Sequence, residues 1–491
     1  MTEYIVQDTS LTAVANKIRS KSGSVTPLEF PDEFINEIDT LSNTSDANAT
    51  AADIRKGKTA YVNAVKLTGT LTSLMPETPT DSILFYSPDA FTLGVFNRSK
   101  NWDGSLYYST DHETWVEWDG STDITAARDA ADAAYLIYLK GSNVSTLNSL
   151  PNFRPNARFV ITGTVIKCVG NLNTVVTTDP ETALASRAFM YIFQDCINID
   201  FDLILPFKYM GDDSYAYMFD GCTMLTKPPS LPATTLASGC YEYMFRNCIR
   251  ITIAPALNCT TLAVQCYRSM FSGCASLINA PSLPALTCET QSYEGMFQNC
   301  TALQIAPSIS ATTINLAGCR RMFSGCSALS TPPVLSATNL YNGSYEYMFE
   351  NCTALTTAPA LPATTLANTC YKYMFSNCTA LINSPALPAT TLATDCYNYM
   401  FVSCTNLISI AELPALTLVS GCYSYMYNKC TKIKMSTTQT GDYQTEYRIP
   451  SSGTGSGSGT ANMFLATGGS FKGTPTINTT YYTSNTVISA T

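Results

Sequence analysis

The sequence predicts an α/β solenoid of ten 26-residue repeats, each with a short strand and a short helix, between flanking segments of other types. Met-Phe pairs recur every 26 residues from Met218-Phe219 to Met400-Phe401. A cysteine stands three residues after each aromatic residue of this series, from Cys196 to Cys430, without insertions. Because a unit this short cannot bury its own apolar face, the units must stack into one array, which spans residues 181–435.

Each unit is predicted to form a short helix followed by an extended segment. In residues 370–378, CYKYMFSNC, the apolar side chains fall at i, i+1, i+4, i+5 and i+8, which is one face of a helix. Thr369 stands where it would cap the start of that helix, and Asn377 where a left-handed residue would end it. Pro385 prevents the helix from continuing. The slot of Asn377 holds glycine or asparagine in six other units: Gly221, Asn247, Gly273, Asn299, Gly325 and Asn351.

The repeat motif resembles BspA-like leucine-rich repeats. In that family an aromatic residue, two residues, cysteine, two residues and leucine follow one another, as in the stretch from Phe245 through Cys248 to Ile251. The variant LPATTLA, at 231–237 and again at 361–367 and 387–393, is similar to versions encoded by gut bacteria and their phages. The resemblance implies leucine-rich-type coils over a little more than half of the chain.

Two units depart from this pattern. Cys288 replaces the leucine of ATTLA, and Cys319-Arg320-Arg321 replaces the Cys-Tyr pair. We expect these coils to be locally irregular.

The cysteines predict a structural ladder of reduced thiols. Serine takes a second cysteine column at Ser214, Ser292 and Ser344, which favours a small buried side chain over a covalent partner. A disulfide between neighbouring coils is the alternative, because the coil spacing falls within the Cα separation of a bridge. Zinc sites use cysteine pairs two to four residues apart and none occurs, so no metal site is predicted. The ladder consists of Cys196, Cys222, Cys248, Cys274, Cys300, Cys326, Cys352, Cys378, Cys404 and Cys430.

The N-terminal residues predict an attachment segment and a hairpin. Residues 1–45 contain two amphipathic helical patterns, and residues 46–80 contain a polar linker and an alternating stretch around Asn63-Ala64 that predicts a short hairpin. The blocks D-T-x-L-T-x-V-A-x-x-I-R-x-K-[ST]-G and A-D-I-x-x-G-K-x-A-Y-V-N resemble N-terminal segments of phage tail and fibre proteins. The resemblance implies docking to other virion proteins. A generic helical cap with a linker is the alternative.

Residues 81–180 predict an all-β, sandwich-like domain. Short β-branched and aromatic runs are separated by Gly, Asn, Asp and Pro. The segment YYSTDHETWVEW predicts a hairpin in which Tyr107 and Tyr108 face Trp115 and Trp118. The order of this hairpin and the FxITGxV strand resembles the domain that precedes such arrays in phage and gut-bacterial proteins, where it would shield the first coil.

The C-terminal residues predict a linker and a cap. Residues 436–459 are rich in Gly and Ser at their end, which is typical of a flexible linker. Residues 460–491 contain a further Met-Phe pair, Met463-Phe464, out of phase with the array. We expect this segment to close the last coil, and a short stalk for assembly is the alternative.

Composition argues against several classes of function. A net charge of -9 disfavours a nucleic-acid binder that tracks phosphates. No apolar run is long enough for membrane insertion, and the first residues lack the pattern of a signal peptide, which predicts synthesis in a host cytoplasm and release by lysis. The sequence shows no cofactor fingerprint, so no cofactor is predicted.

Catalytic residues are not predicted either. His112 is the single histidine, and Ser109, Asp111 and Glu113 lie too close in sequence to orient it as a triad requires. A polysaccharide depolymerase needs only two carboxylates and stays a weaker alternative. Most of the scattered acidic residues of the array are predicted to be solvated surface, among Asp220, Glu242, Glu294, Glu346, Glu350, Asp395 and Glu412.

Two sets of variable positions predict a recognition surface. The first is a series of tyrosines, which offer a large contact area at low entropic cost and whose rows suit sugar rings: Tyr243, Tyr347, Tyr373, Tyr399 and Tyr425. The second lies in the extended segment: Thr252, Asn279, Gln304, Thr331, Thr357 and Asn383. The alternative is that the tyrosines only cover the convex side of the core.

These features and resemblances together predict a phage virion protein of the tail-fibre or receptor-binding type, which presents the repeat surface to a glycan or protein of the host envelope. A bacterial cell-surface adhesin is the main alternative. By analogy with fibres, a homotrimer is considered as the assembly.

Overall fold

The computed structural model describes residues 59–62, 65–68, 76–129, 134–142, 144–147, 158–449, 452–453 and 459–490. The chain divides into two compact units, residues 1–77 with 128–134, and residues 78–127 with 135–491. In the first unit, β1 (Thr59–Val62) and β2 (Val65–Thr68) pair antiparallel, with Val62 opposite Val65. This confirms the hairpin predicted around Asn63-Ala64. The helices predicted within 1–45 lie outside the described residues.

The second unit begins with two β-sheets. The larger sheet has the strand order β12-β11-β3-β9-β5-β6, with β8 also paired to β9, and the smaller sheet has the order β10-β4-β7. A 3-10 helix, η3 (Leu172–Thr174), follows β11. The strands are β3 (Ile83–Ser87), β4 (Thr92–Val95), β5 (Ser105–Ser109), β6 (Val116–Trp118), β7 (Ile124–Thr125), β8 (Ala127–Arg128), β9 (Tyr135–Ser142), β10 (Phe159–Thr162), β11 (Ile166–Asn171) and β12 (Ile199–Ile204).

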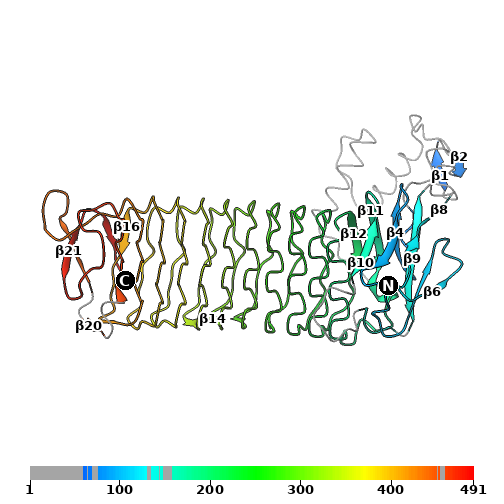
Figure 1. Ribbon diagram of the computed structural model, residues 1–491, viewed down its shortest axis with the longest axis horizontal. Coiled ribbons are helices and arrows are strands. Elements are labelled where there is room, and N and C mark those ends of the chain that lie inside the picture. The colour runs from blue at the N-terminus through cyan, green and yellow to red at the C-terminus, as the bar shows by residue number, and fades with distance from the viewer. Residues whose placement is uncertain are drawn as a thin grey trace, which may run out of the picture. The chain divides into compact units, whose positions relative to one another are not determined.

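The larger sheet continues into the repeat array. Strand β12 belongs to the first coil and pairs in parallel with β11 of the sandwich, whereas β11 pairs antiparallel with β3 (Figure 1). The edge of the sandwich thus supplies the backbone partner that the first coil would otherwise lack.

The hairpin predicted within residues 107–118 is present, but its facing pairs differ. Strands β5 and β6 pair antiparallel with Tyr108 opposite Val116 and Leu106 opposite Trp118. Trp118 is buried in the core while Val116 is exposed. The predicted opposition of tyrosines and tryptophans is therefore wrong, because the buried face of the strand sets the register.

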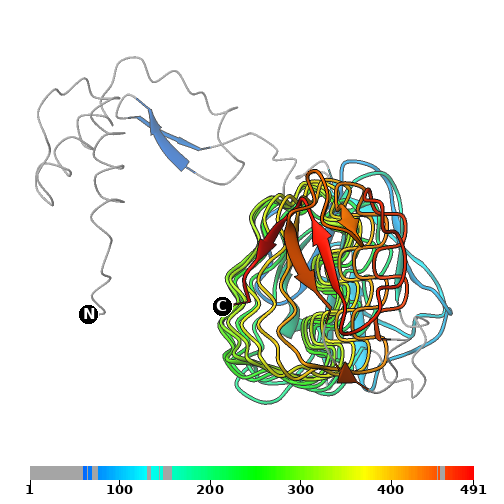
Figure 2. The same ribbon diagram turned by 90° about the vertical axis from the view of Figure 1, so that its left-hand side faces the viewer.

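The array contains no α-helix, so the predicted α/β fold class is wrong. Over residues 181–435, all of which are described, the segments predicted as helices are consecutive tight turns, and coils pair through short parallel bridges and strands. The array is a β-rich repeat, without the strand-plus-helix coils that leucine-rich-type repeats implied. Figure 1 shows the coils side by side, and Figure 2, which views the array along its axis, shows them one behind another.

Hydrogen bonds in residues 369–378 explain why no helix forms. The amide of Met374 donates to the carbonyl of Tyr371, three residues back, at 3.2 Å, whereas the amide of Phe375 donates to Met400 on the following coil, at 2.9 Å. This alternation continues along the segment, so one amide stabilises the coil's own turns and the next joins it to the neighbouring coil. An α-helix would instead direct every amide to the fourth residue back.

Left-handed residues recur at every fourth position of the turn segment. The backbone φ angles are 55° at Thr369, 56° at Tyr373 and 59° at Asn377. The left-handed conformation predicted at Asn377 is confirmed, and the glycines and asparagines that share its slot also have positive φ. Thr369 is not a helix cap, because a capping residue has an extended backbone.

The coils that contain Cys288 and Cys319 are regular. Strands β13 (Thr287–Cys288), β14 (Thr313–Ile314) and β15 (Asn339–Leu340) form a parallel sheet across them. The amide of Cys319 donates to Ser344 on the next coil at 3.0 Å. The predicted local irregularity is therefore wrong, because the backbone bonds between coils do not depend on the side chains that changed.

Stacked aromatic rings form the centre of the array. The rings of one column stack with centroid separations of 5.5–5.8 Å from coil to coil. Phe159 of the sandwich meets the first ring edge-on at 5.7 Å, so both parts share one hydrophobic core. This phenylalanine ladder comprises Phe193, Phe219, Phe245, Phe271, Phe297, Phe323, Phe349, Phe375, Phe401, Tyr427 and Phe464.

A second buried column consists of tyrosines. Its rings stack at 5.6–6.2 Å, and Cys319 interrupts the column between Tyr293 and Tyr345. This buried tyrosine ladder comprises Tyr215, Tyr241, Tyr267, Tyr293, Tyr345, Tyr371, Tyr397 and Tyr423.

The cysteine ladder lies beside the phenylalanine ladder. From Cys222 to Cys430, each ladder thiol donates to the carbonyl of a phenylalanine on the preceding coil, with Sγ···O distances of 2.9–3.2 Å. All 19 cysteines are free and buried. Burial raises the pKa of Cys274 to about 12, so this thiol stays neutral and unreactive in the folded chain.

The C-terminal residues close the last coil. The amides of Tyr425 and Tyr427 donate to Ala461 and Met463 as they would to a further coil. Two strands of the last coils pair in parallel with C-terminal strands: β16 (Ser409–Ala411) with β22 (Thr486–Ile488), and β17 (Thr417–Leu418) with β20 (Ser452–Gly453). Strand β21 (Thr480–Thr483) pairs antiparallel with both β18 (Met435–Ser436) and β19 (Thr445–Arg448). The sequence-based expectation that Met463-Phe464 closes the array is confirmed.

Candidate binding surface

The outer face of the turn segments carries a row of tyrosines. The rings are half-buried, except for that of Tyr191, which is buried, and they stack on the next coil with centroid separations of 4.4–4.7 Å. Ser269, Gly295 and Arg321 interrupt the row in three consecutive coils. The outer tyrosine row contains the five predicted residues Tyr243, Tyr347, Tyr373, Tyr399 and Tyr425 and two further members, Tyr191 and Tyr217.

Every tyrosine of this row has a left-handed backbone, with φ between 55° and 64°. A bulky residue in this conformation costs on the order of 1 kcal/mol, which glycine avoids and asparagine reduces. At the equivalent left-handed slot of Asn247, seven of the ten coils use glycine or asparagine, and the other three have Asp195, Ser403 and Lys429. The tyrosine ring at the outer position must therefore make a favourable interaction that offsets the conformational cost of the left-handed backbone.

The stacking decides which part of each ring a ligand can reach. Within a stack both faces of an inner ring, such as that of Tyr373, are covered by its neighbours, so the row presents ring edges and phenol groups. A sugar ring would therefore meet the edges and phenol groups of the inner members, because their flat faces are covered. Burial, with the neighbouring tyrosines Tyr373 and Tyr425, raises the pKa of Tyr399 to about 12, so this phenol stays a neutral hydrogen-bond donor.

A ladder of alternating charges runs next to the tyrosine row. Arg268 Nη1 lies 2.9 Å from Glu242 Oε1, and Arg268 Nε lies 3.2 Å from Glu294 Oε2. On the next coil, Arg320 Nε lies 2.8 Å from Glu294 Oε1. The Glu294 side chain is only 8% exposed, so the prediction of solvated surface is wrong for this residue.

A second ion pair supports the ring of Tyr243. Arg246 contacts Asp220 through two bonds of 2.9 and 2.7 Å, and the Asp220 side chain is 4% exposed. The Arg246 guanidinium lies 4.6 Å from the Tyr243 ring centroid. Arg321 covers Tyr347 at the same distance on the other side of the interruption. Arginine guanidinium groups thus cover the rings of Tyr243 and Tyr347, the two tyrosines that border the interruption.

The buried carboxyls of this face predict that the fold is more stable at pH 5 than at pH 8. Burial raises the pKa of Asp213, Glu242 and Glu346 above the usual 3.8 and 4.5, although neighbouring basic groups oppose the shift. The folded chain therefore binds these protons more tightly than the unfolded chain. The resulting stability is complete below the usual pKa and is lost as the pH rises through the raised values.

Urea denaturation at both pH values measures this effect, and we expect the higher midpoint at pH 5. The variant Glu242→Gln should show a smaller difference between the two midpoints. An unchanged or inverted order in the native sequence would contradict the prediction.

The second predicted set lies in a different segment of the coil. Thr252, Asn279, Gln304, Thr331, Thr357 and Asn383 are all exposed and lie at or next to the short parallel bridges. Exposed isoleucines accompany them, such as Ile253 and Ile305, which are 60% and 64% exposed. This polar stripe is accessible, but it lacks the backbone cost and the ordered stacking that distinguish the tyrosine row.

His112 has partners that sequence proximity did not indicate. Its Nε2 lies 2.8 Å from Asp81 Oδ1 and 3.5 Å from Ser82 Oγ, and its ring stacks on Tyr138 at 4.4 Å. Ser109 Oγ instead accepts a bond from the His112 amide. A catalytic triad places the carboxylate and the hydroxyl at opposite ring nitrogens, whereas here both face Nε2.

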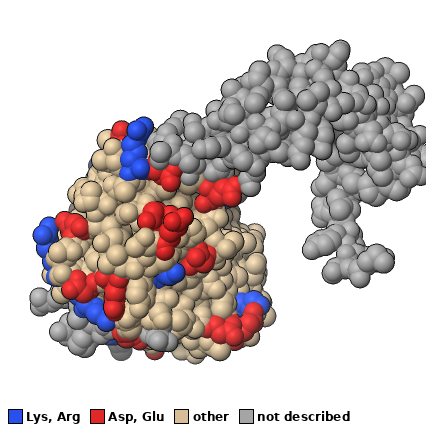
Figure 3. All heavy atoms as spheres, turned by 90° about the vertical axis from the view of Figure 1, so that its right-hand side faces the viewer, with Lys and Arg blue, Asp and Glu red and all other residues tan. Residues whose placement is uncertain are grey.

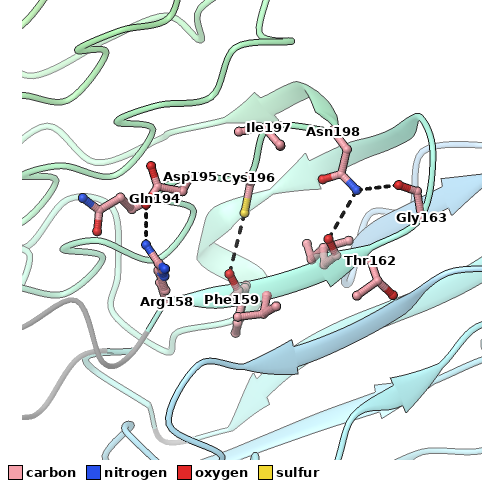
Figure 4. Close-up of a pocket in the computed structure, with 11 residues that line it drawn as sticks. Arg158, Phe159, Thr162, Gly163, Gln194, Asp195, Cys196, Ile197 and Asn198 are labelled. Carbon is pink, nitrogen blue, oxygen red and sulfur yellow. Dashed lines mark hydrogen bonds and ion pairs between the residues drawn. The ribbon is translucent and has the colours of Figure 1, made fainter.

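A pocket of about 250 Å³ lies where β10 meets the first coil (Figure 4). Asn198 Nδ2 donates to the carbonyls of Ile161 and Gly163 at 3.3 and 3.0 Å, and Arg158 pairs with Asp195. Because Asn198 and Arg158 are engaged in contacts that join the first sheets to the array, we interpret the pocket as part of this structural junction.

Further charged side chains lie outside these surfaces among the described residues. On the face seen in Figure 3, acidic and basic side chains lie in small groups of both signs. In the part of the chain that the structure describes, no group of three or more His, Cys, Asp or Glu side chains could hold a metal ion. No helix within those residues has the length and apolar character needed to cross a membrane.

Comparison with known proteins returned no match to any family model, any curated protein or any solved structure.

Proposed function

We propose that this chain is a virion adhesion protein of the tail-fibre or receptor-binding type, and that the outer tyrosine row contacts the host cell envelope. The single observation that carries the binding part is the retention of tyrosine at left-handed positions in seven coils. Glycine or asparagine would lower the backbone cost there, as they do in seven of the ten coils at the slot of Asn247.

The geometry of the row favours an extended ligand with repeated polar groups. Neighbouring rings lie 4.4–4.7 Å apart, so their phenol groups form a regular line along the array axis. A glycan chain or an extended peptide with hydrogen-bonding groups at a similar repeat could bind several phenols at once. Such a ligand would gain affinity with each coil that it spans.

The assignment to a virion rests on the two N-terminal sequence blocks that resemble phage tail and fibre proteins. A bacterial surface adhesin shares the binding role but would be anchored differently. Mass spectrometry of density-purified particles and of the bacterial envelope fraction separates the two. Peptides that band with capsid protein support the virion, and peptides found only in the envelope support the bacterial adhesin.

The binding role is tested with a variant that keeps the backbone conformation. In Tyr347→Asn/Tyr373→Asn/Tyr399→Asn, each asparagine tolerates the left-handed backbone, so the coils remain closed. We expect binding of the labelled chain to cells of gut bacteria to weaken at least about tenfold, because central aromatic contacts dominate interface energies. Circular dichroism confirms that the variant is folded.

The matched control changes the polar stripe of the same region, in Thr331→Ala/Thr357→Ala/Asn383→Ala. We expect this variant to bind like the native chain. The proposal fails if the asparagine variant binds normally, or if only the polar-stripe variant loses binding.

A further inference from the structure

Three positions that break the repeat pattern lie together on neighbouring coils. From Leu236 to Leu418, the column of Cys288 otherwise holds leucine or isoleucine, and the column of Cys319 otherwise holds tyrosine from Tyr215 to Tyr423. From Ser214 to Cys422, the column of Gly318 otherwise holds cysteine or serine. The sulfurs of Cys288 and Cys319 are 3.6 Å apart.

Gly318 provides the space that this sulfur pair needs. A Cβ atom at Gly318 would lie 2.9 Å from Cys288 Sγ, closer than real Cβ atoms come, and 3.0 Å from Ile314 Cγ2, a very tight contact. A cysteine or serine at this position, as in the other coils, would therefore push Cys288 away. Gly318 thus leaves room for Cys288 Sγ beside the sulfur of Cys319.

These two cysteines differ from those of the ladder. Ladder thiols from Cys222 onward donate to a phenylalanine carbonyl of the preceding coil, as Cys300 does to Phe271 at 3.2 Å. Cys288 and Cys319 contact each other instead, and Cys288 also contacts Ser292 Oγ at 3.3 Å. Among the 19 cysteines, all of them described, this is the pair whose sulfurs lie within hydrogen-bonding range of each other.

We propose that Cys288 and Cys319 form the one disulfide of this chain when it folds in the presence of a small-molecule disulfide. One thiolate attacks the oxidant R–S–S–R, which forms a mixed disulfide and releases R–S⁻. The second thiolate then attacks the protein sulfur of the mixed disulfide, which closes the Cys288–Cys319 bond and releases a second R–S⁻. The protein loses two protons and two electrons, and the oxidant becomes two thiols.

The position of the pair suggests what the bond does. Cys319 interrupts the buried tyrosine ladder, so the ring contact between neighbouring coils is missing on both of its sides. A disulfide would tie these coils together where stacking does not, and it would restrain the unfolded chain across the intervening residues. Because both sulfurs are fully buried, we expect the bond to form while the coils close rather than in the finished fold.

The test refolds the full chain from denaturant in a mixture of oxidised and reduced glutathione, followed by acid quenching, alkylation and peptide mass spectrometry. We expect one internal disulfide, between Cys288 and Cys319, and a higher melting temperature than that of chain refolded with reduced glutathione alone. Folded, fully reduced chain placed in the same mixture should oxidise much more slowly.

Two variants make the assignment specific. Cys288→Leu restores the residue of neighbouring coils and should refold without any disulfide, and Cys319→Ser serves if that variant does not fold. The control Cys266→Ser places serine in a column that already contains Ser292, and should keep the bond. Disulfides scattered among ladder cysteines, or a native chain that refolds with all thiols free, would overturn the proposal.

Discussion

Replacing Phe297 with alanine is expected to lower the free energy of unfolding by about 4 kcal/mol, the usual cost of removing a fully buried phenylalanine. Phe297 is completely buried between Phe271 and Phe323, with ring centroids 5.8 and 5.7 Å away. The repeated coils leave little freedom for collapse, because each backbone is bonded to the next. Urea denaturation followed by circular dichroism measures the loss.

The variant Phe297→Leu separates ring stacking from burial. Leucine fills much of the same space but cannot stack, so we expect it to lose about 2 kcal/mol, the sum of two aromatic contacts. If Phe297→Ala costs less than about 1 kcal/mol, the phenylalanine ladder does not form a rigid core.

Replacing Gly469 with alanine is expected to open the C-terminal end of the array, at a cost of about 3 kcal/mol. A Cβ atom at Gly469 would lie 2.1 Å from the amide nitrogen and 2.3 Å from the carbonyl oxygen of Met435. Both atoms belong to the backbone, so no side-chain rotation relieves the clash. We expect faster hydrogen exchange at Tyr425 and Tyr427, whose amides donate to residues of the closing segment.

The control for this prediction is Gly441→Ala. Gly441 has a φ of 58°, but a Cβ atom there would meet nothing within 4 Å. Only the conformational cost of about 1 kcal/mol applies, and exchange at Tyr427 should not change. Equal effects of the two substitutions would show that packing against Met435 is not what holds the closing segment.

The sequence predicted the repeat, the strands of the sandwich and the closing role of Met463-Phe464, because each depends on local pattern or on exact spacing. The helix predicted in each repeat unit was wrong. The apolar residues Cys370, Met374 and Cys378 are spaced by four, and so are the left-handed Thr369, Tyr373 and Asn377. A strict period of four is not the 3.6 of a helix, and it matches a chain of turns that each end in a left-handed residue.

The candidate site was predicted in part for similar reasons. The positions of the outer tyrosines follow from the period, but their left-handed backbone and mutual stacking become visible only in the structure. The charge ladder did have a sequence signal, since Glu242, Arg268, Glu294 and Arg320 alternate in sign at one position of the repeat. No sequence signal indicated the contact of His112 with Asp81, because this contact joins a hairpin turn to a distant strand end.

The alternation between neighbouring coils bears on how such an array can change in length during evolution. Glutamate and arginine alternate from Glu242 to Arg320, and asparagine alternates with glycine from Gly221 to Asn351, where Gly273 makes room for the Asn247 side chain. Loss of a single coil by recombination would place Glu242 beside Glu294, two like charges in direct contact. Loss or duplication of two coils would keep both alternations, so between Gly221 and Asn351 pairs of coils are the units in which this array can shrink or grow at the least cost in stability.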